Sequence, residues 1–205
     1  MRNRRQFGFT LIELVVTLIV AAILVGLAVP SFRDLIDKSR LRGATDDLVN
    51  LLNIARGSAV KLGHNVNVSI DGTSTWCAGA ISATNPTTPG ESVSTITACA
   101  CSTAPGACVV GDQPLTLSYT SYLSGSNHVT LTSVDTTIAS SGAGNGGLTF
   151  TSKFGALDLS GALPASPLVE LRSPLGKYST RVTVSPLGQT YVCSVGKFIS
   201  GYPTC

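Results

Sequence analysis

Residues 9–29 read FTLIELVVTLIVAAILVGLAV and contain one charged residue, Glu13. A helix of this length crosses the hydrocarbon core of a bilayer, because about 20 apolar residues span it. A secretory signal would be cut after its apolar run at small residues, but Ala28 and Val29 are followed here by Pro30. The segment is therefore expected to be retained as a transmembrane helix.

Glu13 is the unusual residue of this segment, because a carboxylate at the bilayer centre costs about 2–3 kcal/mol and less near the interface. One interpretation is a single-pass anchor whose Glu13 lies among the lipid headgroups. The other is that Glu13 has a partner or a function. Charge pattern alone leaves both open.

The string MRNRRQFG followed by FTLIELVVTLIVAAILVGLAVPSF resembles the type IV prepilin signature. The shared features are a short basic leader ending in Gly8, an aromatic Phe9, Glu13 four residues on, and Pro30 near the end of the apolar run. The resemblance implies that a prepilin peptidase removes residues 1–8, cutting between Gly8 and Phe9, and methylates the new amino group of Phe9. It also implies that Glu13 pairs with the Phe9 amine of a neighbouring subunit, an attraction that is strong in low-dielectric surroundings.

The chain of 205 residues suits one domain with a membrane segment rather than a multidomain enzyme. Its formal net charge of +3 comes from 14 basic and 11 acidic residues. Arg2, Arg4 and Arg5 lie in the leader, so its removal leaves 14 − 3 = 11 basic against 11 acidic residues. Overall charge therefore gives no reason to expect a nucleic-acid or acidic partner.

Residues 30–63 are expected to continue the helix in amphipathic form, and Pro30 to allow a bend or local unwinding. Apolar residues follow one face at steps of three and four: Leu41, Ala44, Leu48, Leu51, Ala55, Ala59 and Leu62. Gly63 is a plausible stop. The whole helix is thus predicted from Phe9 to about Leu62.

Residues 64–205 are expected to form a head of mainly antiparallel β-sheet packed on this helix, an α+β fold of the pilin-like kind. The strand candidates are 66–70, 73–81, 115–122, 128–134, 148–154, 167–173, 180–185 and 189–195. Asp71-Gly72 is predicted as the turn of the first hairpin. The sequence SPLG at 185–188 is predicted as the turn of the last one.

The six cysteines all follow the apolar segment, which favours disulfides in an oxidising periplasm. Cys99, Cys101 and Cys108 lie in a segment of about 82–113 without sustained periodicity, interpreted as a long loop. Cys99 and Cys101 are too close to pair comfortably with each other. If Cys193 pairs with Cys205, Cys77 should therefore take one of them and Cys108 the other. A metal site is not expected, since paired C-x-x-C halves and a nearby histidine are missing.

Other motifs are weak. The segment GAGNGG at 142–147 satisfies G-x-G-x-x-G, but a strand candidate follows it where a dinucleotide site needs a helix. His64 and His128 form no catalytic or metal spacing with acids or cysteines. We therefore expect no enzyme, no catalytic residue and no cofactor.

Within the superfamily the chain resembles the FimT/GspH group, through its long helix running into strands and its C-terminal RVTVSPLGQTYVC hairpin. This implies a minor pilin of a type IV pilus, or alternatively the minor pseudopilin H of type II secretion. The expected location is the inner membrane with a periplasmic head, then a filament. The expected partners are the prepilin peptidase, membrane lipid and other pilins or pseudopilins.

A third alternative is a DNA-capturing minor pilin, as some FimT-like proteins are associated with DNA uptake through a basic C-terminal region. The region 168–205 holds four basic residues against Glu170: Arg172, Lys177, Arg181 and Lys197. However, the group's Gly-Arg-x-Arg turn is replaced by Gly188-Gln189-Thr190-Tyr191. Nucleic acid is therefore not the expected partner, and salt-dependent binding of duplex DNA would test it.

Overall fold

The computed structural model describes residues 10–72, 76–82, 99–118, 129–135, 146–159 and 167–205. The side chains of residues 27–31 lie outside this description. The chain forms two compact units, Met1–Ile36 and Asp37–Cys205. The second unit is called the head below.

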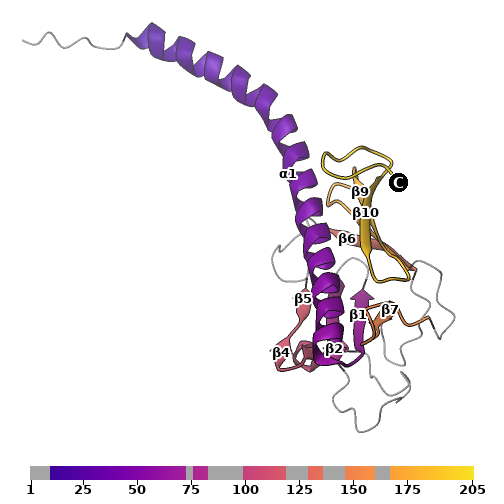
Figure 1. Ribbon diagram of the computed structural model, residues 1–205. Helices are drawn as coiled ribbons and strands as arrows, with labels where there is room; N and C mark the ends of the chain where they lie inside the picture. The colour runs from indigo at the N-terminus through magenta and orange to yellow at the C-terminus, as the bar shows by residue number, and fades with distance from the viewer. Residues whose placement is uncertain (1–9, 73–75, 83–98, 119–128, 136–145, 160–166) are drawn as a thin grey trace, which may run out of the picture. The chain divides into compact units, whose positions relative to one another are not determined.

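The longest element is the helix α1, Leu11–Leu62, which contributes to both units (Figure 1). Its end agrees with the predicted Leu62, and its predicted first residue, Phe9, lies outside the described residues. Gly63 follows in the left-handed conformation, φ 69°, which is the usual way for a glycine to close a helix. Pro30 lies within α1, and its role in a bend stays a prediction.

The described strands form two four-stranded antiparallel sheets and one two-stranded sheet. The first has the order β5-β2-β1-β7, the second β10-β9-β8-β6, and the small sheet pairs β3 with β4. Their bounds are β1 Val66–Gly72, β2 Trp76–Ser82, β3 Val109–Val110, β4 Gln113–Pro114, β5 Thr116–Ser118, β6 Thr130–Asp135, β7 Gly146–Phe150, β8 Leu168–Arg172, β9 Ser179–Val184 and β10 Thr190–Val195. The predicted α+β fold, a long helix with antiparallel sheet, is confirmed.

One apolar core joins the helix to both large sheets. Of the predicted stripe, Leu62 is partly buried and the others are buried: Leu41, Ala44, Leu48, Leu51, Ala55 and Ala59. Leu52, which was not predicted, is buried beside them. Against it lie Val68 and Ile70 of β1 and Val182 of β9. Burial of each large aliphatic side chain stabilises the fold by about 2 kcal/mol, so this stripe holds the helix on the head.

Polar contacts fix where the helix lies on the sheets. The hydroxyls of Thr45 on α1 and Thr180 on β9 are 2.8 Å apart and buried. Arg56 donates to the carbonyl oxygens of Gly155 and Leu187, at 3.2 and 3.1 Å. These carbonyls belong to the loops that follow β7 and β9, so one guanidinium ties a loop of each large sheet to the helix.

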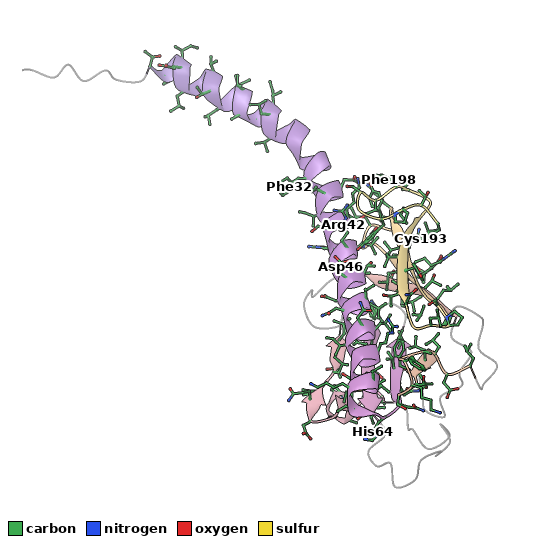
Figure 2. The ribbon with its side chains drawn as sticks, viewed as in Figure 1. Phe32, Arg42, Asp46, His64, Cys193 and Phe198 are labelled. Carbon is green, nitrogen blue, oxygen red and sulfur yellow. A yellow bond between two sulfur atoms is a disulfide. The ribbon has the colours of Figure 1, made fainter. Side chains whose placement is uncertain are left out.

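The C-terminal segment is also held against the helix. The Tyr202 hydroxyl donates to Asp46 at 2.7 Å, and the Ser194 amide donates to the Pro203 carbonyl at 2.7 Å. Partial burial, and then the Asp46 carboxylate, raise the pKa of the Tyr202 phenol above its ordinary value. Figure 2 shows Asp46 and Arg42 on the stretch of α1 that faces the C-terminal strands.

Three details of the sequence prediction are corrected. Asp71 and Gly72 are not a turn, because they pair with Cys77 and Trp76 as the last residues of β1. The true connection falls at 73–75, outside the described residues. The strand predicted at 148–154 ends at Phe150, because Phe154 and Gly155 both have φ 63°, which extended strand cannot contain. Within the predicted loop 82–113, Ser82 ends β2, and residues 109–110 and 113–114 form β3 and β4.

Candidate functional site

Glu13 lies in the first turn of α1, at the spacing from Thr10 that a capping box has. Thr10 immediately precedes the helix, and its hydroxyl accepts a long hydrogen bond, 3.4 Å, from the Glu13 backbone N–H. The sequence Thr-x-x-Glu at a helix start is the pattern in which both side chains satisfy free backbone N–H groups. A carboxylate there also interacts favourably with the helix dipole. Glu13 therefore has a local structural role in addition to any role between subunits.

The helix around Glu13 has its apolar side chains uncovered. Every described residue from Thr10 to Gly26 is exposed, although nearly all are apolar. Leu11, for example, is 82% exposed and Leu24 63%. Large exposed apolar surfaces mark contact with lipid or with another protein.

The membrane prediction and the cleavage prediction extend past the described part of the chain. Within that part, no helix has both the length and the apolar character of a membrane span. The predicted span 9–29 includes residue 9 and the side chains of 27–29, which lie outside the description. Gly8 and Phe9, the predicted cleavage site, lie outside it too.

All six cysteines are paired in the structure: Cys77 with Cys101, Cys99 with Cys108, and Cys193 with Cys205. This is one of the two arrangements that the sequence left open. The Cα atoms within the pairs are 6.0, 5.1 and 5.0 Å apart, inside the range of protein disulfides. The first pair fastens the segment 99–108 to β2, the second closes that segment on itself, and the third fastens Cys205 to β10.

The first two disulfides cover the face of the first sheet that points away from α1. Side chains alternate along a strand, so Cys77 and Gly79 point away from the core residues Ala78 and Ala80 of β2. A Cβ atom at Gly79 would lie 2.6 and 2.7 Å from the sulfurs of Cys99 and Cys108. Glycine at this position therefore lets the disulfide approach the strand.

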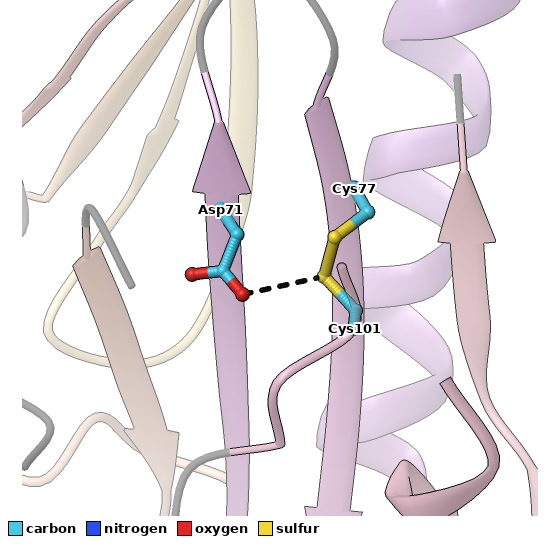
Figure 3. Close-up of side chains that lie close together, drawn as sticks. All are labelled: Asp71, Cys77 and Cys101. Carbon is cyan, nitrogen blue, oxygen red and sulfur yellow. Dashed lines mark hydrogen bonds between the residues drawn. A yellow bond between two sulfur atoms is a disulfide. The ribbon is translucent and has the colours of Figure 1, made fainter. Parts of the chain in front are cut away.

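Asp71 of β1 is buried on the same face. Its Oδ2 lies 3.7 Å from the Cys101 sulfur. Figure 3 shows the Asp71 carboxylate beside the Cys77–Cys101 disulfide. Asp71, Cys77 and Cys101 have the side-chain types of a metal site, with ligand atoms within 4.8 Å of one another. Both sulfurs belong to a disulfide, however, and metals bind the thiolate. The disulfide accounts for this cluster.

The four predicted basic residues of the C-terminal region have different surroundings. Arg181 donates to Glu170 through Nε and Nη2, at 3.0 and 2.6 Å, so its charge is paired. Arg172 donates to the Gly176 carbonyl at 3.2 and 3.1 Å and braces its own loop. Lys177 and Lys197 are exposed. The structure therefore does not gather the four into one free cationic surface.

Sequence reasoning missed a tyrosine in this region. The Tyr178 ring is nearly buried and has Lys38 Nζ 4.8 Å and Lys197 Nζ 5.9 Å from its centroid. Ammonium groups over an aromatic face within about 6 Å are attracted to it. Lys38 is on α1 and lies far from the others in the chain, so no local sequence signal connects them.

Comparison with known proteins adds one match. Residues 3–29 match the family described as the prokaryotic N-terminal methylation motif. No curated protein and no solved structure matches the chain. The matched range contains Gly8, Phe9, Glu13 and the apolar run. Such a motif implies prepilin peptidase processing, a membrane anchor and assembly with other pilins, and it indicates a structural subunit rather than an enzyme. Residues 3–29 are therefore a prokaryotic N-terminal methylation motif, the signal of type IV prepilin-like proteins.

Proposed function

We propose that this chain is a minor pilin, a low-abundance subunit near the tip of a type IV pilus that helps to start filament assembly. One observation carries the proposal: the methylation motif leads into a helix whose apolar side chains are exposed on every side from Leu11 to Gly26. That surface needs lipid before assembly and the helices of other subunits afterwards. The head begins beyond it and has its own core.

The proposed life cycle follows from the motif residue by residue. The precursor is anchored in the inner membrane by residues 9–29, with the head in the periplasm. A prepilin peptidase cuts between Gly8 and Phe9 and methylates the Phe9 amine. Glu13 then pairs with the Phe9 amine of a neighbouring subunit as the helix joins the filament core.

The pilus is proposed ahead of type II secretion because of the disulfide-fastened segment 99–108. The Cys77–Cys101 disulfide fastens this segment to the outer face of the first sheet, the Cys99–Cys108 disulfide closes it on itself, and Gly79 leaves room for its sulfurs. Such rigidity suits a part of the head that contacts partners at an exposed filament tip. The resemblance to FimT and GspH covers both systems, so an experiment has to separate them.

The test compares pili and secreted proteins in a strain with and without this gene. Quantitative peptide mass spectrometry of sheared pili is expected to find the mature chain well below the major subunit, and the deletion strain is expected to make few pili. Normal piliation together with loss of secreted enzymes would instead identify a pseudopilin. Complementation with the full-length gene is the control for both measurements.

A further inference from the structure

A group of cationic and apolar side chains surrounds Tyr178 where the head begins. We call it the Tyr178 patch. It consists of Lys38 and Lys197, whose ammonium groups lie over the ring, and of their neighbours in the two adjoining chain segments, Arg172, Leu175, Lys177 and Phe198. Lys38 and Lys197 lie over the ring from α1 and from the loop that follows β10. Arg172 is the last residue of β8, and Leu175 and Lys177 belong to the connection between β8 and β9.

Hydrogen bonds hold this connection in one conformation. The Leu175 amide donates to Asp37 Oδ1 at 2.9 Å, which fixes the loop to the first residue of the head. The amides of Lys177 and Tyr178 donate to the Ser173 hydroxyl at 3.2 and 3.1 Å. The patch is therefore formed before any partner arrives, which lowers the entropy cost of binding.

Two apolar side chains project from the patch into solvent. Leu175 is 49% exposed and Phe198 64%, whereas the neighbouring Ile199 is fully buried and anchors the second loop in the core. Figure 2 places Phe198 on the chain beyond the C-terminal strands, with Arg42 on the neighbouring stretch of α1. Exposed aromatic and aliphatic groups ringed by lysines are typical of surfaces that enter the headgroup region of a membrane.

The charges of the patch are cationic on balance. Lys38, Lys177 and Lys197 each bring an ammonium group, and Arg172 a guanidinium. The carboxylate of Asp37 lies among them but is buried, so it offsets the field without facing an approaching surface. A surface rich in anionic lipid attracts each such cation, within about a Debye length.

We propose that the Tyr178 patch binds anionic lipid headgroups of the membrane in which the same chain is anchored. The inference rests on the membrane anchoring in the proposed function. Asp37, the first residue of the head, comes 37 − 26 = 11 residues after Gly26 and accepts a hydrogen bond from the Leu175 amide, so the patch lies next to the point where the chain enters the head. Binding of duplex DNA would account for the cations but not for the exposed side chains of Leu175 and Phe198. Binding of anionic lipid would account for both, so lipid is the favoured partner.

Binding of this kind would hold the head down on the bilayer before assembly. The lysines would contact phosphate groups, while Phe198 and Leu175 enter between the headgroups. Extraction of the helix into a filament would then have to release the patch. The lipid composition would thus influence how readily the subunit leaves the membrane.

The test uses the full chain in nanodiscs of phosphatidylcholine, with or without anionic phosphatidylglycerol. Trp76 is buried and is the single tryptophan of the sequence, so Phe198→Trp adds a reporter in the patch above a constant background. Its emission is expected to shift to shorter wavelength when phosphatidylglycerol is present and to return in high salt. Tyr191→Trp, 57% exposed at the other end of β10, is the matched reporter and is expected not to shift.

Charge variants identify the groups responsible. In the Phe198→Trp chain, Lys177→Gln with Lys197→Gln is expected to abolish the shift. The control pair Lys61→Gln with Lys153→Gln removes two positive charges from exposed positions elsewhere on the head. This pair is expected to leave the emission shift unchanged.

Three outcomes overturn the proposal. The first is equal emission in both lipids, and the second is a shift that survives the Lys177 and Lys197 changes. The third is a shift caused by duplex DNA but not by phosphatidylglycerol, which would assign the patch to nucleic acid. A chain that does not remain in phosphatidylcholine nanodiscs would contradict the membrane anchoring itself, and a chain that remains there without a shift contradicts the patch alone.

Discussion

Replacing Glu13 with alanine is expected to leave leader removal intact and to eliminate the protein from filaments. The carboxylate is proposed to pair with the Phe9 amine of a neighbouring subunit among apolar helices. Removing one partner of a buried ion pair leaves the other charge unpaired and costs about 3 kcal/mol, roughly a hundredfold in an equilibrium. The measurement is the amount of mature chain in sheared pili relative to that in the membrane.

Two matched variants separate the charge of Glu13 from its place in the capping box. Glu13→Gln keeps a side chain that suits the capping box but has no charge, so it should fail to be incorporated as Glu13→Ala does. Thr10→Ala weakens the cap by about 1 kcal/mol and keeps the charge, so it should be incorporated. Normal incorporation of Glu13→Gln would assign the residue to helix capping and contradict the intersubunit pair.

Replacing Gly79 with alanine is expected to lower the free energy of unfolding by about 2 kcal/mol, since overpacking typically costs 1–3. The new methyl group would lie 2.6 and 2.7 Å from the Cys99 and Cys108 sulfurs, well inside contact distance. A disulfide cannot rotate one sulfur away without moving the other, so the backbone has to shift. Urea unfolding of the full chain in detergent, followed by Trp76 fluorescence, measures the loss.

The same substitution elsewhere in the chain provides a control of opposite sign. Gly57 lies on the exposed face of α1, and an added Cβ there meets nothing within 4 Å. Gly57→Ala should therefore stabilise the protein by about 0.5–1 kcal/mol through helix propensity. In a chain with Cys99→Ala and Cys108→Ala, the cost of Gly79→Ala should fall, because only the contact with Cys101 Cβ at 3.2 Å remains. An equal cost with and without the disulfide would contradict the proposed contact.

The helix and most of the described strands could be predicted from the sequence, because both kinds of element follow local patterns of apolar residues. The apolar steps from Leu41 to Ala59 define one helical face, and that face is buried. Alternating apolar residues predicted strands close to β1, β8, β9 and β10. The sequence SPLG predicted the last turn, in which the Gly188 amide donates to the Ser185 carbonyl at 2.8 Å.

The same alternation could not reveal what covers the far face of the first sheet. Asn67, Ser69 and Asp71 alternate with apolar residues, a pattern typical of a sheet with one face in water. All three are buried, and the disulfide-fastened segment 99–108 lies on their side of the sheet. Asp71 is buried beside cysteines far from it in the chain, and local sequence alone predicts a hairpin turn at the Asp71-Gly72 pair, which instead ends β1.

The basic residues show a similar limit. Counting charges in 168–205 treated Arg172, Lys177, Arg181 and Lys197 as one group. Strand pairing sets Arg181 opposite Glu170, and loop closure turns Arg172 onto Gly176. The cation that joins Lys197 at Tyr178 is Lys38, which the helix supplies from the other end of the chain. Such groupings arise only from tertiary structure.

The central claim is that the chain is processed as a prepilin and assembled through its N-terminal helix. Intact-mass analysis and N-terminal peptide sequencing of the protein isolated from its native envelope test this most directly. The account predicts a mature chain that lacks residues 1–8, begins at N-methylated Phe9 and carries three disulfides. A chain that retains Met1–Gly8, or that begins after residue 29, would contradict it.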